Sequence, residues 1–77
     1  MVTHPENFPM RVKEVRRQLG LSQEELAHAL GVSFATVNRW ENGKTAPSKL
    51  AMKQFTAFCA GQTHSGRLKL DNKDTNA

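Results

Sequence analysis

The chain contains a single cysteine, Cys59, and lacks any apolar run long enough to cross a bilayer. One cysteine excludes an intrachain disulfide and a cysteine-based metal cage, and it fits a reducing cytoplasm. No signal-peptide pattern opens the chain. The three histidines, His4, His28 and His64, are scattered without a metal-ligand spacing on one helix. We therefore expect neither a metal site nor contact with a membrane.

Signatures of catalysis are also missing. The sequence has no glycine-rich phosphate loop and no paired carboxylates on a pocket-forming scaffold. Cys59 has no neighbouring histidine or aspartate pattern that would make it a nucleophile, so we interpret it as a small buried apolar residue. These absences predict a protein that is not an enzyme and needs no cofactor.

What the chain does have is an excess of positive charge. Eleven lysines and arginines against seven aspartates and glutamates give a net charge of +4 over 77 residues. A basic balance in so small a chain favours a polyanionic partner such as nucleic acid, although many soluble domains are basic without binding one. The length allows one small domain with a thin hydrophobic core.

The first predicted helix follows a polar arm. Residues 1–8 include Pro5 and are expected to form a flexible N-terminal arm. Helical periodicity starts after Pro9, whose fixed φ suits a first helical position. One face is marked by spacings of three and four residues: Val12, Val15, Arg16 and Leu19. Gly20 supplies a left-handed stop, and Leu21 can fold back onto the helix as in a Schellman ending.

A second predicted helix covers residues 23–30. Ser22 and Glu25 have the spacing of a capping box at its start, and Gly31 ends it. Its apolar stripe consists of Leu26, Ala27 and Leu30.

A third predicted helix covers residues 34–42, with Ser33 as its N-cap and with Val37 and Trp40 on its inner face. Only residues 31–33 separate it from the second helix, which leaves room for no more than a tight turn. Two helices joined in this way form a helix-turn-helix unit, whose second helix fits the major groove of DNA.

Pro47 and Ser48 mark the start of a fourth helix, which is expected to end at Ala60 or Gly61. Its buried side is predicted to consist of Leu50, Ala51, Phe55, Phe58 and Cys59.

The remaining residues, 62–77, are polar and are predicted to form a mostly disordered C-terminal tail. A short strand over 67–71 is the alternative, because Leu68 and Leu70 alternate with charged residues. The folded domain is thus expected to span residues 9–61.

Together these motifs resemble the Cro/repressor (Xre-type) helix-turn-helix family. The resemblance covers about residues 12–58 and is carried by LGLSQEELA at 19–27, GVS at 31–33, WENGK at 40–44 and PS at 47–48. It implies an all-α, lambda-repressor-like bundle of four or five helices that binds double-stranded operator DNA, commonly as a homodimer on a palindromic operator. No clear fifth helix follows Gly61, and in many members that region helps the subunits to pair.

The outward side of the third helix carries the candidate base-reading residues. With Val37 and Trp40 inward, the helical period places Ala35, Asn38, Arg39 and Asn42 outward, with Phe34 beside them. Arg39 is the first choice for direct readout, because its guanidinium can donate two hydrogen bonds to O6 and N7 of guanine. Asn38 would pair with adenine or reach a phosphate. Phe34, Ala35 and the methyl of Thr36 would contact thymine methyl groups.

Three of these roles have alternatives that do not involve DNA. Phe34 would instead pack against the first helix, because a large apolar side chain usually seeks burial. Asn38 would be a solvated surface residue. Arg39 would be an exposed cation near Glu41 or Glu24.

A different set of residues is expected to contact DNA phosphates. The amino end of the second helix presents free N–H groups, to which Gln23 can add its side-chain amide. The resemblance implies that Gln23 clamps a phosphate on one side of the groove. It assigns positions near phosphates on the other side to Ser33, Asn42, Lys44 and Lys49. For the two lysines the alternative is an ordinary role at the surface.

Arg16 lies on the otherwise apolar face of the first helix, where an unpaired charge would be costly. The resemblance implies that it pairs with Glu41 and so ties the first helix to the end of the third. We therefore predict a structural ion pair between these two residues.

The function that these features favour is transcriptional regulation, most often repression, by a cytoplasmic, nucleoid-associated protein. The alternative is an antitoxin-like or protein-interaction subunit whose tail or fourth helix binds a partner protein. A third hypothesis, that the domain targets a larger enzyme assembly to DNA, has no active site in this sequence to support it.

Overall fold

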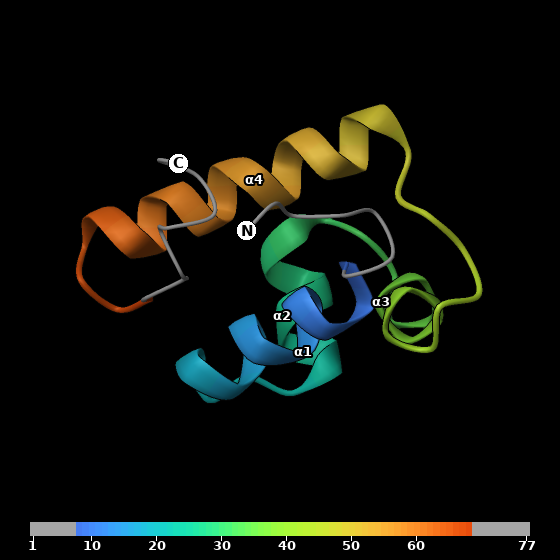
Figure 1. Ribbon diagram of the computed structural model, residues 1–77, viewed down its shortest axis with the longest axis horizontal. Coiled ribbons are helices and arrows are strands. Elements are labelled where there is room, and N and C mark those ends of the chain that lie inside the picture. The colour runs from blue at the N-terminus through green and yellow to red at the C-terminus, as the bar shows by residue number, and fades with distance from the viewer. Residues whose placement is uncertain (1–7, 69–77) are drawn as a thin grey trace.

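The computed structural model describes residues 8–68, which fold into four α-helices with no strand among them. The helices are α1 (Phe8–Leu19), α2 (Gln23–Leu30), α3 (Phe34–Glu41) and α4 (Lys49–His64). Figure 1 shows α4 lying across the group formed by the three shorter helices. The all-α, four-helix architecture predicted from the sequence is therefore confirmed for the described residues. The remainder of the predicted arm and tail, residues 1–7 and 69–77, lies outside them.

The start of α1 differs from the prediction. The helix begins at Phe8, which was assigned to the arm, and not after Pro9. The reason is that the Phe8 ring is part of the core. Its centroid lies 5.4 Å from that of Trp40 and 5.3 Å from that of Phe55, with both pairs edge to face. Such aromatic pairs add about 0.5–1.5 kcal/mol each beyond the area that they bury. Phe8 thus joins α1 to α3 and α4.

The predicted end of α1 and the predicted start and end of α2 are confirmed, while α3 ends at Glu41, one residue before the predicted end, with Asn42 as its C-cap. Gly20 has a φ of 69°, and the N–H of Leu21 donates to the carbonyl of Arg16 over 3.0 Å, which is the Schellman ending of α1. At α2 the capping box closes in both directions. The N–H of Glu25 donates to Ser22 Oγ over 3.0 Å, and the N–H of Ser22 donates to Glu25 Oε1 over 2.8 Å.

The tight turn between α2 and α3 fixes the angle of the unit. Gly31 adopts a φ of 76°, a left-handed conformation that L side chains rarely adopt. The N–H of Val32 donates back to the carbonyl of Ala27 over 3.0 Å, and Ser33 then caps α3. Helix α3 packs against both α1 and α2 and buries Val37 and Trp40 among them.

The prediction that α4 ends at Ala60 or Gly61 is wrong, because the helix continues to His64. The chain turns only at Gly66, which has a φ of 85°. This reversal returns Leu68 to the core, where 1% of its surface is exposed. Part of the predicted tail therefore belongs to the folded domain. Of the alternative strand over 67–71, the described residues Arg67 and Leu68 are not in a strand, and the rest lies outside the described range.

The predicted buried side of α4 is right for Phe55 and Cys59, while Leu50 is a correction. Leu50 is 66% exposed, whereas Phe55 and Cys59 are buried and Ala51 and Phe58 are partly buried against the core. The residues that face inward follow one another at spacings of three and four. Leu50 falls outside this stripe because it shares a face with Gln54, which is also exposed.

The burial of Leu68 leads to a stability prediction. Leu68→Ala should lower the free energy of unfolding by about 2–4 kcal/mol, because it removes a fully buried side chain and leaves a cavity. Urea denaturation followed by the fluorescence of Trp40, the one tryptophan of the chain, measures this change. The control is Leu50→Ala, which should change stability by less than about 0.5 kcal/mol. Equal effects of the two substitutions would contradict the assignment of Leu68 to the core.

Candidate nucleic-acid interface

Helix α3 has a buried inner face and an exposed outer face. Val37 and Trp40 are 0% and 2% exposed and belong to the core. On the outer side Ala35 and Arg39 are exposed and Asn38 is partly exposed. The helical period thus predicts correctly which side chains leave α3 toward solvent, and it brings the candidate base-reading residues onto one surface.

Arg39 has a free guanidinium. Glu41, one of the two carboxylates that could have held it, is occupied by Arg16 and Gln23. Within residues 8–68 Arg39 makes no ion pair. Its five N–H groups are therefore available to an acceptor outside this part of the chain.

Phe34 and Thr36 stand at the first turn of α3. Phe34 is 49% exposed, so it is a surface residue and not part of the buried core. The Thr36 hydroxyl lies 2.8 Å from the Ser33 hydroxyl, and the N–H of Thr36 donates to Ser33 Oγ over 3.1 Å. Ser33 thus caps α3 as the sequence predicted, and the Thr36 hydroxyl is held against this cap.

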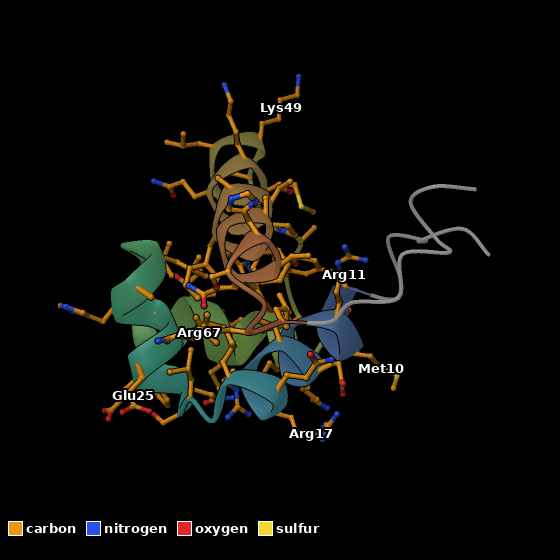
Figure 2. All side chains as sticks on the ribbon, turned by 90° about the vertical axis from the view of Figure 1, so that its left-hand side faces the viewer. Met10, Arg11, Arg17, Glu25, Lys49 and Arg67 are labelled. Atoms are coloured by element: carbon orange, nitrogen blue, oxygen red, sulfur yellow. The ribbon has the colours of Figure 1, made fainter. Side chains whose placement is uncertain are left out.

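The two lysines assigned to phosphates lie on either side of the connection between α3 and α4. Lys44 is exposed, and its backbone N–H donates to the carbonyl of Arg39 over 2.9 Å, closing the end of α3. Lys49 is the first residue of α4, and Figure 2 shows its side chain at the far end of the molecule from Glu25 and Arg17. Both ammonium groups lie on long flexible stems, as suits sequence-independent attraction to phosphates.

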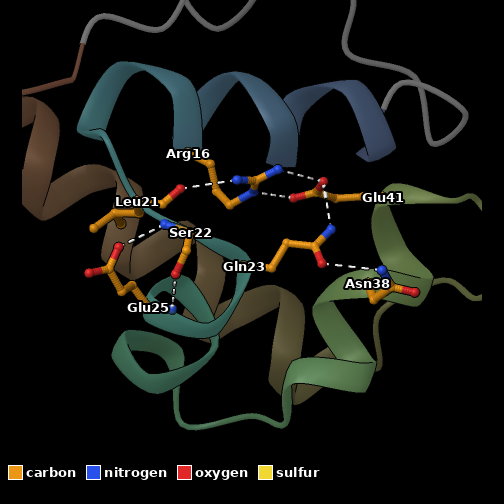
Figure 3. A network of polar contacts seen from close by, with 7 residues as sticks. All are labelled: Arg16, Leu21, Ser22, Gln23, Glu25, Asn38 and Glu41. Carbon is orange, nitrogen blue, oxygen red and sulfur yellow. Dashed lines mark hydrogen bonds and ion pairs between the residues drawn. The ribbon is translucent and has the colours of Figure 1, made fainter.

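Arg16 and Glu41 meet as predicted by their resemblance to the family pair. The Nε of Arg16 donates to Glu41 Oε2 over 2.6 Å, and its Nη2 donates to Glu41 Oε1 over 3.0 Å. The third guanidinium nitrogen, Nη1, donates to the carbonyl of Leu21 over 3.0 Å. Figure 3 shows the guanidinium between the end of α1 and the carboxylate from α3. The side chain of Glu41 is 3% exposed and that of Arg16 is 25% exposed.

The protonation state of Glu41 follows from these contacts. Burial alone raises the pKa of its carboxyl, but the hydrogen bonds from Arg16 and Gln23 and the positive charge of Arg16 outweigh burial and lower the pKa below its ordinary value. The carboxylate is therefore ionised at neutral pH and acts only as an acceptor.

Gln23 takes part in a chain of hydrogen bonds that the sequence did not predict. Its Nε2 donates to Glu41 Oε1 over 3.0 Å, and its Oε1 accepts from Asn38 Nδ2 over 3.1 Å. The Oδ1 of Asn38 in turn accepts from Asn42 Nδ2 over 3.1 Å. Figure 3 shows the contacts of Gln23 with Glu41 and with Asn38. Gln23 and Asn38 are fifteen positions apart on different helices, so no local spacing could have revealed the contact.

Neither a metal-binding cluster nor a membrane-spanning helix is found in the part of the chain that the structure describes. Among residues 8–68 no group of histidine, cysteine, aspartate and glutamate side chains is placed to hold a metal ion. None of the four helices in this range has both the length and the apolar character to cross a membrane. Burial raises the pKa of the Cys59 thiol to about 11, which leaves it an unreactive thiol at neutral pH.

Helices α2 and α3, joined by a tight turn at Gly31, form a helix-turn-helix unit, and comparison with known proteins agrees. The pattern of the helix-turn-helix family matches residues 12–59, more than half of the chain. This chain belongs to the helix-turn-helix family, in its Cro/repressor (Xre) type, a family of DNA-binding transcription regulators.

Two relatives that this chain matches over most of their length are named as HTH-type transcriptional regulators. An uncharacterized HTH-type transcriptional regulator of Methanothermobacter thermautotrophicus is 40% identical over 53 residues, covering 69% of this chain and 75% of that protein. The uncharacterized HTH-type transcriptional regulator YiaG of Escherichia coli K12 is 33% identical over 67 residues, covering 87% of this chain and 70% of that protein. No solved structure shows a significant match.

Another relative is an enzyme. The type II methyltransferase M1.ScrFI of Lactococcus lactis subsp. cremoris is 44% identical over 50 residues, which cover 61% of this chain. The match spans only 13% of that enzyme. A second methyltransferase, M.SsoII of Shigella sonnei, is matched over 15% of its length. The shared region is thus the helix-turn-helix domain.

The Arg16–Glu41 pair leads to a prediction about pH. Because the pKa of Glu41 is lowered on folding, its contribution to stability is present above the ordinary glutamate pKa of about 4.3 and is lost as the pH falls through the folded value. Glu41→Gln should therefore cost about 1.5–3 kcal/mol of unfolding free energy at pH 7, the usual range for hydrogen bonds to a charged group. The difference from wild type should shrink below a pH of about 4.3.

Urea denaturation between neutral and acid pH measures this difference. Glu14→Gln serves as the matched control. Glu14 accepts from Arg17 and Gln18, and its pKa is lowered to about 2, but its ion pair is at the surface. Solvent screens such a pair, so this substitution should have a small effect at every pH. A Glu41→Gln effect that does not change with pH would contradict the ionised buried pair.

Proposed function

We propose that this chain is a transcriptional regulator that binds specific sequences of double-stranded DNA by inserting α3 into the major groove, and that it acts as a repressor. The observation that carries the proposal is the free guanidinium of Arg39 on the outward side of α3. Val37 and Trp40 on the inner side are buried, and the Glu41 carboxylate is held by Arg16. A planar fork of donors on a groove-sized helix matches the O6 and N7 acceptors of guanine.

The residues around Arg39 extend the proposed readout. Phe34 is 49% exposed at the first turn of α3, and Ala35 is exposed beside it. Apolar groups at this end of a recognition helix suit the thymine methyl group. The methyl of Thr36 takes the same role, with its hydroxyl held in the cap of α3.

Phosphate contacts are proposed on both sides of the groove. Gln23, as the first residue of α2, lies where free backbone N–H groups attract an anion. Ser33, Asn42, Lys44 and Lys49 are exposed and are proposed to anchor the opposite strand. These contacts position the domain without carrying sequence information.

The proposal includes a homodimer on a palindromic operator and a cytoplasmic, nucleoid-associated location.

The alternative function, binding of a partner protein, is supported by an exposed surface on α4. Leu50 and Met52 are 66% and 39% exposed near the start of this helix. The methyltransferase relatives carry a domain like this one in a small part of their length. We propose that this chain itself supplies DNA binding and no catalysis.

The proposed readout predicts the outcome of substituting Arg39. Arg39→Ala should reduce the ratio of specific to non-specific affinity by about fivefold to 150-fold, the equivalent of a bidentate contact worth about 1–3 kcal/mol. Arg39→Lys is the matched control for charge. It should lose nearly as much specificity while keeping general binding, because lysine carries the charge without the fork. The measurement is a titration of a duplex selected from random sequence against a random duplex. An unchanged ratio in both variants would show that Arg39 does not read a base.

Lys44 should behave differently. Lys44→Ala removes a proposed phosphate contact, so it should weaken binding to all duplexes alike and reduce the slope of log K against log[salt] by about one. The measurement is the same titration repeated at several salt concentrations. A loss of affinity confined to the selected duplex would contradict the phosphate role.

A further inference from the structure

The hydrogen bonds between α2 and α3 form a chain with a single direction. It runs from Asn42 to Asn38, from Asn38 to Gln23, and from Gln23 to Glu41, with an amide nitrogen donating at each step. A carboxamide presents a donor group on one side and an acceptor on the other, and either side can face a given neighbour. Something must therefore decide which way each amide points.

Glu41 determines the direction in which the amides point. Its carboxylate is buried and engaged by Arg16, and an ionised carboxylate can only accept. Gln23 must therefore turn its nitrogen toward Glu41, which leaves its oxygen toward Asn38. Asn38 must then donate from its nitrogen to the oxygen of Gln23, which leaves the oxygen of Asn38 to accept from Asn42. One acceptor at the end of the chain thus orients three amides in succession.

We infer that Glu41 is a positioning residue for DNA binding, whose buried carboxylate fixes the orientation of Gln23, Asn38 and Asn42 before DNA arrives. The inference rests on the proposed function, because these three side chains belong to the proposed DNA-binding surface. Immobilising a side chain on binding typically costs about 0.5–1.5 kcal/mol, roughly a twofold to tenfold change in affinity. Because the hydrogen bonds order these side chains when the protein folds, this free energy is not lost again on DNA binding.

The chain also changes the role of Asn38. Both its nitrogen and its oxygen are engaged within the protein. A bidentate contact with adenine would need a donor and an acceptor of the same amide. Asn38 therefore links Gln23 to Asn42, and its second N–H and second lone pair stay available to a base or a phosphate.

Glu41→Gln tests the inference because it replaces the pure acceptor by a group of similar shape that can also donate. The introduced amide can turn its nitrogen toward Gln23, so both directions of the chain become accessible. In the free protein, the side-chain NH₂ signals of Gln23, Asn38 and Asn42 should all change in a ¹H–¹⁵N NMR spectrum. The control Glu14→Gln removes another carboxylate that accepts from a glutamine, and it should change the signals of Gln18 alone.

The DNA affinities of Glu41→Gln and Glu14→Gln should differ from each other, which gives a second test. Both substitutions remove one negative charge, which by electrostatics alone strengthens binding to DNA. Glu14→Gln should therefore bind the tightest duplex from a random pool as well as wild type or better. Glu41→Gln should bind it about threefold to tenfold more weakly, measured where both variants are folded. Binding by Glu41→Gln as tight as that of Glu14→Gln would overturn the inference.

Two outcomes separate this inference from the proposed function. If Glu41→Gln does not fold, Gln23→Met is the second variant. It interrupts the series of amide hydrogen bonds and leaves the Arg16–Glu41 pair intact. The signals of Asn38 and Asn42 should then change, and unchanged signals would overturn the inference. If the wild-type protein binds no duplex, the proposed function and the DNA role of Glu41 both fail. The NH₂ signals of the free protein would still decide whether Glu41 orients the chain.

Discussion

The carboxylate of Glu41 is the group on which the arrangement of the first three helices depends. It receives Arg16 from α1 and Gln23 from α2 while itself ending α3. A buried charge in this position is tolerated only because its oxygens are occupied, since an unpaired buried charge would cost several kcal/mol. The same contacts that satisfy the charge therefore hold the angle between α2 and α3, and with it the surface that α3 presents.

The sequence predicted the parts of the fold that local chemistry determines. Ser22 and Glu25 identified the start of α2, and Gly20 identified the end of α1, because caps and left-handed glycines act over a few residues. It failed where distant packing decides the outcome. Phe8 joins the helix because its ring meets Trp40 and Phe55, and Leu68 becomes buried because the chain reverses after α4. Neither contact has a local signal.

The same division applies to the candidate site. The helical period alone placed Arg39 outward and Trp40 inward. The approach of Arg16 to Glu41 was available only through resemblance to a family, since these residues are twenty-five positions apart. The amide chain from Glu41 through Gln23 to Asn38 was missed altogether. Its members look like ordinary surface amides in the sequence, and only the packing of α2 against α3 makes them neighbours.

The most direct test of the account is to titrate the ¹⁵N-labelled protein with a duplex selected from random sequence and to follow each backbone amide by NMR. Insertion of α3 into the major groove predicts that the largest changes lie at residues 33–44 and at the start of α2. The exposed side of α4 around Leu50 and Met52 should change little. Changes concentrated on α4, with α3 unaffected, would contradict the recognition role of α3 and favour a surface on α4 as the binding site.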